Sequence, residues 1–170
     1  VHYKFRHACG LEPVPHAPRV RHWLQTHAVD SASVVQQDLR TSPVAVFDLS
    51  VGSLELGLPD EYDTTEKFTR MLFGRMQADG GAVGIGRYRE PRLIYASGDF
   101  ATTGENGTEY RTVHIGLDVF QAAGSPVYAA FDGVVHSFAD NTARCDYGPC
   151  IVLEHRTDEG DVFYTLYGHL

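Results

Sequence analysis

Residues 111–120 read RTVHIGLDVF, an apolar and β-branched run that a single glycine interrupts. This composition is typical of a β-strand. The same character continues in four more segments, separated by Gly, Pro, Asp and Asn: PVYAAF (126–131), GVVHSFA (133–139), CIVLEHR (150–156) and VFYTLYGHL (162–170). No segment after residue 80 has the length and period of a helix, so the second half of the chain predicts a mostly antiparallel sheet.

One helix is expected to pack on this sheet. The segment DTTEKFTRMLFGRMQADGG (63–81) has the apolar spacing of an amphipathic helix. Asp63 and Glu66 have capping-box spacing, and Gly80 is placed to end the helix. The expected buried stripe consists of Phe68, Met71, Leu72 and Met76. The sequence therefore predicts an α+β fold with a mainly antiparallel β-sheet, one packed helix and a helical N-terminal lead-in.

The lead-in is predicted from HAPRVRHWLQTHA (16–28), which places Val20, Trp23, Leu24 and His27 on one helical face. A second short helix is expected at SASVVQQDLR (31–40), and TSP (41–43) ends the pattern. We assign residues 1–42 to a helical lead-in or linker. Residues 43–170 are assigned to the β-rich domain.

Three segments of the middle region have simpler interpretations. VAVFDLSVGS (44–53) predicts a strand and a turn. GAVGIGRYREP (81–91) is glycine-rich, but no helix follows it, so it does not predict a phosphate-binding loop. GDFATTGENGTEYR (98–111) predicts a polar loop with a turn at Asn106-Gly107.

The bulk composition excludes several classes of function. The formal net charge of −8 argues against a general nucleic-acid binder and against attachment to anionic surfaces. No apolar stretch reaches the roughly 18 residues of a membrane span. Cys145 and Cys150 flank the sequence DYGP and could pair across a turn, although two reduced cysteines agree better with the rest of the sequence.

The chemistry of the opening stretch lies in His114 and Asp118. In a regular strand these two residues share a face but lie roughly 13 Å apart, too far to meet at one ion. Gly116, between them, can take a bulge or kink that folds the two side chains together. The stretch therefore leaves two interpretations open: two polar residues at a strand edge, or two ligands of one metal ion.

The order of the downstream motifs favours the metal. After His114 and Asp118 come GSPVYAAFDGVV (124–135), then GPCIVLEH (148–155), then YGHL (167–170). This order resembles the lysostaphin/LytM-type zinc metallopeptidases, which cut peptide cross-bridges or stems in bacterial cell walls. The resemblance covers about residues 111–170.

The resemblance implies a role for each matching residue. His114 and Asp118 correspond to the first two zinc ligands of the family. His169 corresponds to the catalytic histidine that orients or deprotonates the attacking water or stabilises the oxyanion. Asp132 and Gly133 match a structural turn, and His136 and His155 are expected to be structural.

The family takes its third zinc ligand and a second catalytic histidine from an H-x-H motif that this sequence does not contain. Because a catalytic zinc needs three protein ligands and an open position, we expect these 170 residues to be part of a longer chain and a poor peptidase alone. The expected cofactor is Zn²⁺ and the expected substrate is a peptide or a peptidoglycan-like molecule. Neither nucleic acid nor a membrane is expected as a partner.

The lead-in, together with residues 43–53 and 90–100, also resembles the middle of large fusion proteins. In these, a LytM-like domain lies between a kinase-like domain and a class-III aminotransferase domain. This resemblance implies flanking domains and a cytoplasmic location, whereas a wall hydrolase would be extracellular or periplasmic. Two alternatives to a peptidase remain: a non-catalytic binding or spacer module, and a lipoyl-type carrier hairpin. The second is weak because residues 122–155 contain no lysine.

Overall fold

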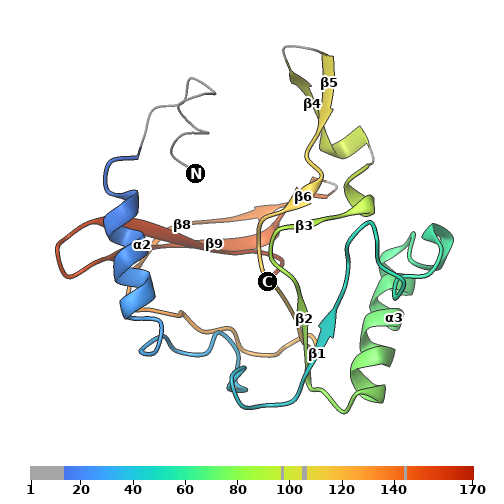
Figure 1. Cartoon of the computed structure of the whole chain (residues 1–170), viewed down its shortest axis with the longest axis horizontal. Coiled ribbons are helices and arrows are strands. Elements are labelled where there is room, and N and C mark those ends of the chain that lie inside the picture. Colours follow the sequence, from blue (N-terminus) through green and yellow to red (C-terminus); the bar gives the residue numbers. More distant parts are fainter. Residues whose placement is uncertain (1–13, 97, 105–106, 144) are drawn as a thin grey trace. The chain divides into compact units, whose positions relative to one another are not determined.

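The computed structural model describes residues 14–170, except residues 97, 105, 106 and 144. The described residues fall into two compact units, which are treated separately: residues 35–128 form one, and residues 14–34 with 129–170 form the other. Helices and strands, labelled in Figure 1, confirm an α+β fold in which all strand pairs but one are antiparallel.

The unit of residues 35–128 is built around a small mixed sheet and one long helix. Its elements are β1 (Val44–Phe47), η1 (Pro59–Glu61), α3 (Thr65–Ala78), β2 (Val83–Gly86), β3 (Glu90–Pro91), η2 (Leu93–Ala96), η3 (Gly98–Phe100), β4 (Ala101–Gly104), β5 (Gly107–Tyr110), β6 (Val113–His114) and β7 (Asp118–Phe120). β1 pairs in parallel with β2, and β2 pairs antiparallel with β7. Two short antiparallel pairs, β3 with β6 and β4 with β5, complete the unit.

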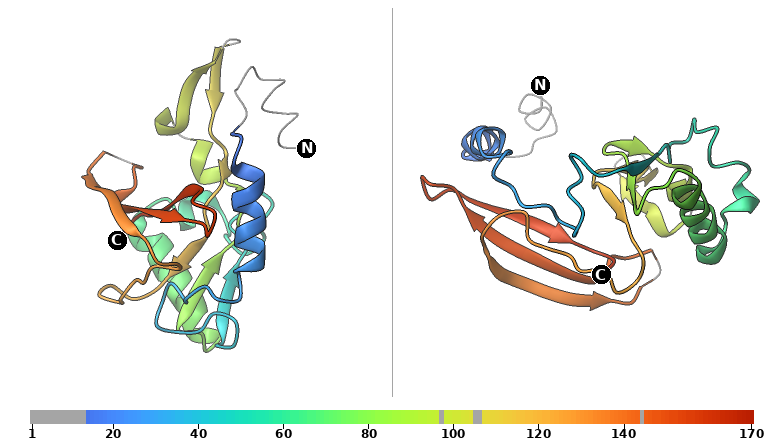
Figure 2. Two further views of the ribbon diagram at one scale, coloured as in Figure 1. Left: turned by 90° about the vertical axis from the view of Figure 1, so that its left-hand side faces the viewer. Right: turned by 90° about the horizontal axis from the view of Figure 1, so that it is seen from below.

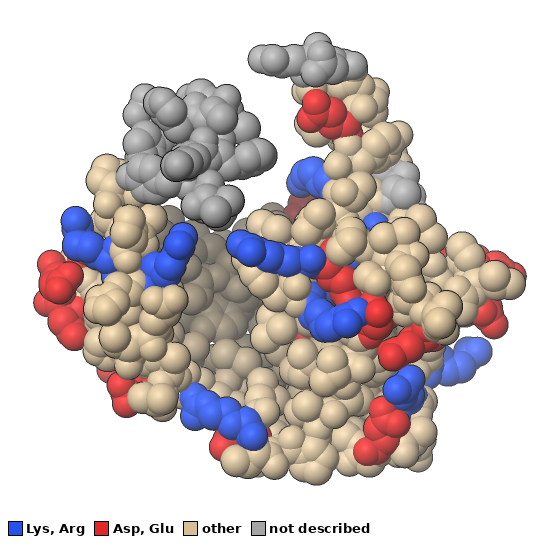
Figure 3. Space-filling model, in the orientation of Figure 1, with Lys and Arg blue, Asp and Glu red and all other residues tan. Residues whose placement is uncertain are grey.

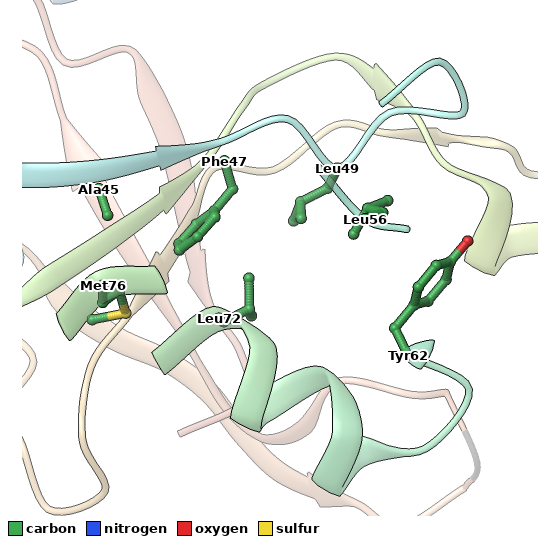
Figure 4. Close-up of a cluster of buried hydrophobic side chains, with 7 residues drawn as sticks. All are labelled: Ala45, Phe47, Leu49, Leu56, Tyr62, Leu72 and Met76. Atoms are coloured by element: carbon green, nitrogen blue, oxygen red, sulfur yellow. The ribbon is translucent and has the colours of Figure 1, made fainter. Parts of the chain in front are cut away.

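The core of this unit lies between α3 and the sheet. Leu72 and Met76 are the buried residues of α3, and Phe68 and Met71 pack against the same cluster. The predicted stripe is therefore confirmed. Figure 4 shows how the buried side chains converge from α3, β1 and the loop that follows β1: Ala45, Phe47, Leu49, Leu56, Tyr62, Leu72 and Met76.

The ends of α3 differ in part from the prediction. Thr64, not Asp63, is the N-cap, because its hydroxyl accepts a hydrogen bond from the backbone N–H of Lys67. Asp63 instead forms an ion pair with the Lys67 ammonium at 2.8 Å. Gly80 has a φ of +67° and follows the C-cap, as predicted.

The second unit consists of α2 (Ala17–Thr26) and three strands, β8 (Val134–Asn141), β9 (Gly148–Arg156) and β10 (Val162–Tyr167). The strands form an antiparallel sheet in the order β10-β9-β8, visible as one curved layer in Figure 2. The register of β8 against β9 shifts between Val135 and Ser137. All three strands agree with the sequence prediction.

Helix α2 packs on this sheet. Val20 is buried, and the Trp23 ring lies 5.3 Å from Phe131 and 5.6 Å from Phe163, measured between ring centroids. The helix is also tied to the loop before β10, because the Arg19 guanidinium donates to both oxygens of Asp161 at 2.6 and 2.5 Å. Only the first helix of the predicted lead-in is present.

Residues 31–40 do not form the second helix that we expected. They are extended and turned, with one bridge from Val35 to Val127. The carboxylate of Asp38 accepts hydrogen bonds from the backbone N–H of Arg40 and the hydroxyl of Thr41. Such local side-chain bonds compete with helical hydrogen bonding.

Two further predictions need correction. PVYAAF (126–131) is not a strand, since its only ladder contact is the bridge at Val127; Pro126 has no N–H to donate. The expected polar loop at 98–111 contains the hairpin β4–β5. Asn106, half of the predicted turn, lies outside the described residues.

Candidate metal centre

The run RTVHIGLDVF is kinked at its glycine. It forms two short strands, β6 and β7, separated by residues 115–117. His114 on β6 pairs with Glu90 on β3, whereas Asp118 on β7 pairs with Gly86 on β2, so the chain changes sheets at the bend. As a result, His114 Nε2 lies 3.5 Å from Asp118 Oδ1. The kink postulated from the sequence is present, and it replaces a separation of roughly 13 Å expected in a regular strand.

Gly116 is required here for space. It does not have a positive φ. A Cβ at this position would lie 3.1 Å from His114 Nε2 and 3.2 Å from His114 Cε1. The absence of a side chain therefore lets the imidazole fold back over the bend toward Asp118.

The other oxygen of Asp118 is held by an arginine. Arg92 Nη2 donates to Asp118 Oδ2 at 2.5 Å. The same guanidinium donates through Nε and Nη2 to Glu90 Oε2, at 3.1 and 3.0 Å. The side chains of Arg92 and Glu90 are only 5% and 3% exposed. This buried pair was not foreseen from the sequence.

The network continues away from Asp118. Glu90 Oε1 accepts from the backbone N–H of Leu49 at 2.9 Å and from Arg87 Nε at 3.2 Å. Arg87 also forms an ion pair with Asp48. Figure 3 shows acidic and basic side chains next to one another on this face, which agrees with the ion pairs between arginine and aspartate side chains.

The charges in this network stabilise one another. Burial opposes the charged form of Arg92, but Asp118 and Glu90 more than offset it, so the pKa of Arg92 is raised above its ordinary value. Hydrogen bonds from Arg87 and Ser50 lower the pKa of Asp48 to about 2. Asp48 and Arg92 are therefore both charged at neutral pH.

Gly86 makes room for the contact between Arg92 and Asp118. A Cβ at Gly86 would lie 2.6 Å from Asp118 Oδ2 and 3.1 Å from Arg92 Nη2. Gly84, on the same strand, leaves room for the ring of Phe47 and the sulfur of Met76. The glycine-rich segment 81–91 thus contains two strands, β2 and β3, and the glycines of β2 allow close packing.

His169 lies in the other unit, within the sequence YGHL. Its φ of +57° is unusual for a residue other than glycine. Its backbone N–H donates to the carbonyl of Tyr147 at 2.7 Å, and Leu170 N–H donates to the carbonyl of Pro149 at 3.0 Å. The imidazole is exposed while its backbone is fixed, and residues with such backbone conformations cluster at functional sites.

His155 has the structural role that we expected. It is 1% exposed, its Nδ1 lies 2.8 Å from the carbonyl of Asp132, and its Nε2 lies 2.8 Å from the hydroxyl of Thr165. Because a carbonyl can only accept, Nδ1 carries the proton and Nε2 is bound by Thr165. Both ring nitrogens are therefore used by the protein. His136 is exposed at the β8 register shift and contacts the ring of Tyr164.

The donors at His114 and Asp118 fit two positions around a zinc ion. Bonds of about 2.0–2.2 Å at a tetrahedral angle place two donor atoms about 3.4 Å apart, close to the observed 3.5 Å. Within the described residues, no group of three or more His, Cys, Asp or Glu side chains is gathered for a metal. The described residues thus bring together two donor atoms whose separation suits zinc. In the described part of the chain, no disulfide joins Cys145 to Cys150.

Comparison with known families gives one match. Residues 112–170 match the model of Peptidase family M23. The matched segment includes His114, Asp118 and His169, and it confirms the LytM-type resemblance over this part of the chain. Comparisons with curated proteins and with solved structures gave no match. Among the described residues, no helix has both the length and the apolar character needed to cross a bilayer.

Proposed function

We propose that residues 43–170 belong to a zinc-dependent peptidase domain in which His114 and Asp118 are metal ligands and His169 is a catalytic residue. The observation that carries this proposal is the kink at Gly116, which brings an imidazole nitrogen and a carboxylate oxygen to 3.5 Å inside the segment similar to Peptidase family M23. Zinc dependence is the general property of that family, and the donor types agree with it.

The bound zinc would act as a Lewis acid that polarises the scissile carbonyl. The contribution of this chain's residues is more specific. His114 and Asp118 present one nitrogen and one oxygen from a bend that needs no further rearrangement. His169 presents an exposed imidazole on a backbone fixed by Tyr147, and we assign it the transfer of a proton from the attacking water.

The described residues bring two ligands together, and a catalytic zinc needs three from the protein. We propose that the third ligand is a histidine of an H-x-H motif outside these 170 residues. We propose a peptide of the peptidoglycan type as substrate, because that is the substrate class of the LytM-type enzymes that the segment resembles.

A second candidate is a non-catalytic module of the same fold that binds or separates other domains, as in the aminotransferase fusions. The observation in its favour is the same incomplete set of donors among the residues described here. The two candidates predict different metal contents in the natural open reading frame.

The experiment is to express the natural open reading frame that contains this sequence and to measure its zinc content and its hydrolysis of purified peptidoglycan and of cross-bridge peptides. His114→Ala and Asp118→Ala serve as metal-ligand variants, and His169→Ala as the catalytic variant. If the peptidase proposal is correct, the wild type and His169→Ala should contain zinc, whereas His114→Ala and Asp118→Ala should not. Only the wild type should hydrolyse the substrates. Equal zinc in the wild type and His114→Ala would favour the spacer module.

A further inference from the structure

We propose that Arg92, held in place by Glu90, is a positioning residue that makes Asp118 a one-oxygen ligand. Arg92 binds Oδ2 of Asp118 and leaves Oδ1 directed to His114. This inference rests on the proposed zinc site. It adds two residues, from a segment before the matched part of the chain, to the determinants of metal binding.

The geometry restricts the Asp118 carboxylate to one orientation. A carboxylate can bind a metal through one or both oxygens, and rotation of the group exchanges them. Here Oδ2 is engaged by Arg92 at 2.5 Å, and the 3.5 Å contact with His114 is made by Oδ1. Rotation would break the bond to Arg92, whose charge has little access to water because its side chain is 5% exposed.

Arg92 itself is fixed from three directions. Its backbone N–H donates to the carbonyl of Thr112 at 2.8 Å, which ties it to the chain just before β6. Its guanidinium is bound twice by Glu90 Oε2. Gly86 leaves the space in which Nη2 reaches Asp118. Because the guanidinium is fixed independently of Asp118, it can determine the position of the Asp118 carboxylate.

Glu90 also sets the charge that a metal ion meets. A lone arginine in contact with Asp118 would neutralise the carboxylate and weaken its attraction for a cation. With Glu90 bound to the same guanidinium, the connected side chains carry three negative charges (Asp48, Glu90, Asp118) and two positive charges (Arg87, Arg92). Asp118 thus keeps an effective negative charge although an arginine contacts it.

The test uses the protein encoded by the natural open reading frame that contains this sequence. Binding of zinc alone is measured by competition with a chromophoric chelator, and Co²⁺ is used because its visible absorption reports coordination geometry. Glu90→Gln keeps the shape of the side chain and removes its charge. Arg92→Lys keeps the charge but cannot contact both Glu90 and Asp118 through a planar fork. Arg75→Lys is the control for the substitution itself, since Arg75 pairs with Asp79 and Glu55 rather than with Glu90 and Asp118.

We expect Glu90→Gln and Arg92→Lys to weaken zinc binding about tenfold, the lower end of the effect of residues that orient metal ligands. Arg92→Lys should also change the Co²⁺ spectrum, because both oxygens of Asp118 become available. Arg75→Lys should match the wild type. In an Asp118→Asn background, Arg92→Lys should have no further effect on zinc affinity, since Arg92 acts through that carboxylate.

The outcomes separate this inference from the proposed function. Equal zinc affinity in the wild type and His114→Ala would overturn both. A second outcome would overturn only the positioning role. In it, the wild type binds zinc more tightly than His114→Ala, but Glu90→Gln and Arg92→Lys have the same zinc affinity and Co²⁺ spectrum as the wild type. Loss of cooperative thermal unfolding in both network variants would also overturn it, because the network would then support the fold rather than one carboxylate.

Discussion

Gly116, Gly86 and Gly133 each leave space that neighbouring atoms occupy. Gly116 admits the imidazole of His114, and Gly86 admits the contact between Arg92 and Asp118. Gly133 lies against β9, where a Cβ would be 2.7 Å from both the carbonyl of Glu154 and Nδ1 of His155. A methyl group at any of these positions should therefore have a local and specific effect.

Replacement of Gly116 by alanine should act on metal binding more than on stability. The new methyl group would contact His114 Nε2 at 3.1 Å and push the ring away from Asp118. We expect zinc affinity to fall about tenfold, with little change in the melting temperature. Chelator competition and thermal unfolding measure the two effects, and an unchanged zinc affinity would show that the ring position does not depend on Gly116.

Replacement of Gly133 by alanine should act on stability. Because the clash involves backbone and a buried imidazole with two hydrogen bonds, we expect a loss of about 1–3 kcal/mol in the free energy of unfolding. Gly74→Ala, in α3, is the matched control. No atom lies within 4 Å of its Cβ, and alanine is favoured in a helix by about 0.5–1 kcal/mol. Urea denaturation should give opposite signs for the two variants.

Asp48 provides a pH test of the charged network. Its pKa in the folded protein, about 2, lies below the ordinary value of 3.8, so ionised Asp48 stabilises the fold above pH 4. This contribution is lost as the pH falls from about 4 toward 2. The free energy of unfolding of the wild type should therefore fall more steeply over this range than that of Asp48→Asn. Parallel slopes in urea denaturation at several pH values would contradict the assignment.

Elements with strong periodicity were predicted well, and elements defined by distant partners were not. α3 follows from its apolar stripe, and β8, β9 and β10 follow from their apolar runs and turn residues. Residues 31–40 have apolar spacing compatible with a helix, but the hydrogen bonds of Asp38 favour a turn. Periodicity reports which face is buried, and it carries no information on such local competition.

The same limit explains what was missed at the site. The spacing of His114, Gly116 and Asp118 indicated that a kink could form, but it left a simple strand edge open as the other interpretation. Glu90 and Arg92 are two residues apart in a short segment, and nothing in REPR (89–92) indicates that both would be buried. Their role depends on the pairing of β3 with β6, which joins segments more than twenty residues apart.

The docking of α2 can be tested as an element. Trp23 contacts Phe131, Phe163 and His27, so Trp23→Ala should destabilise the β8–β9–β10 unit by about 2 kcal/mol, less than a fully buried tryptophan. Leu54→Ala, at a residue that is 99% exposed, should be nearly neutral. Urea denaturation measures both, and equal effects would mean that α2 does not contribute to this unit.

At the scale of the whole molecule, the residues named in the proposed function belong to different compact units. His114 and Asp118 lie in residues 35–128, and His169 lies in the other unit. Although the net charge is −8, several charged side chains are paired locally, including those of the network that reaches Asp118. Metal binding by His114 and Asp118 can therefore be measured separately from the catalytic role proposed for His169.

The most direct measurement is a zinc-edge anomalous difference map from crystals of the protein encoded by the natural open reading frame that contains this sequence, grown with a zinc salt. The account predicts a peak about 2.0–2.2 Å from both His114 Nε2 and Asp118 Oδ1, with Arg92 still bound to Asp118 Oδ2. A map with no peak between these two atoms, or with zinc bound only elsewhere on the chain, would contradict the central claim that the kink at Gly116 creates a zinc-binding pair.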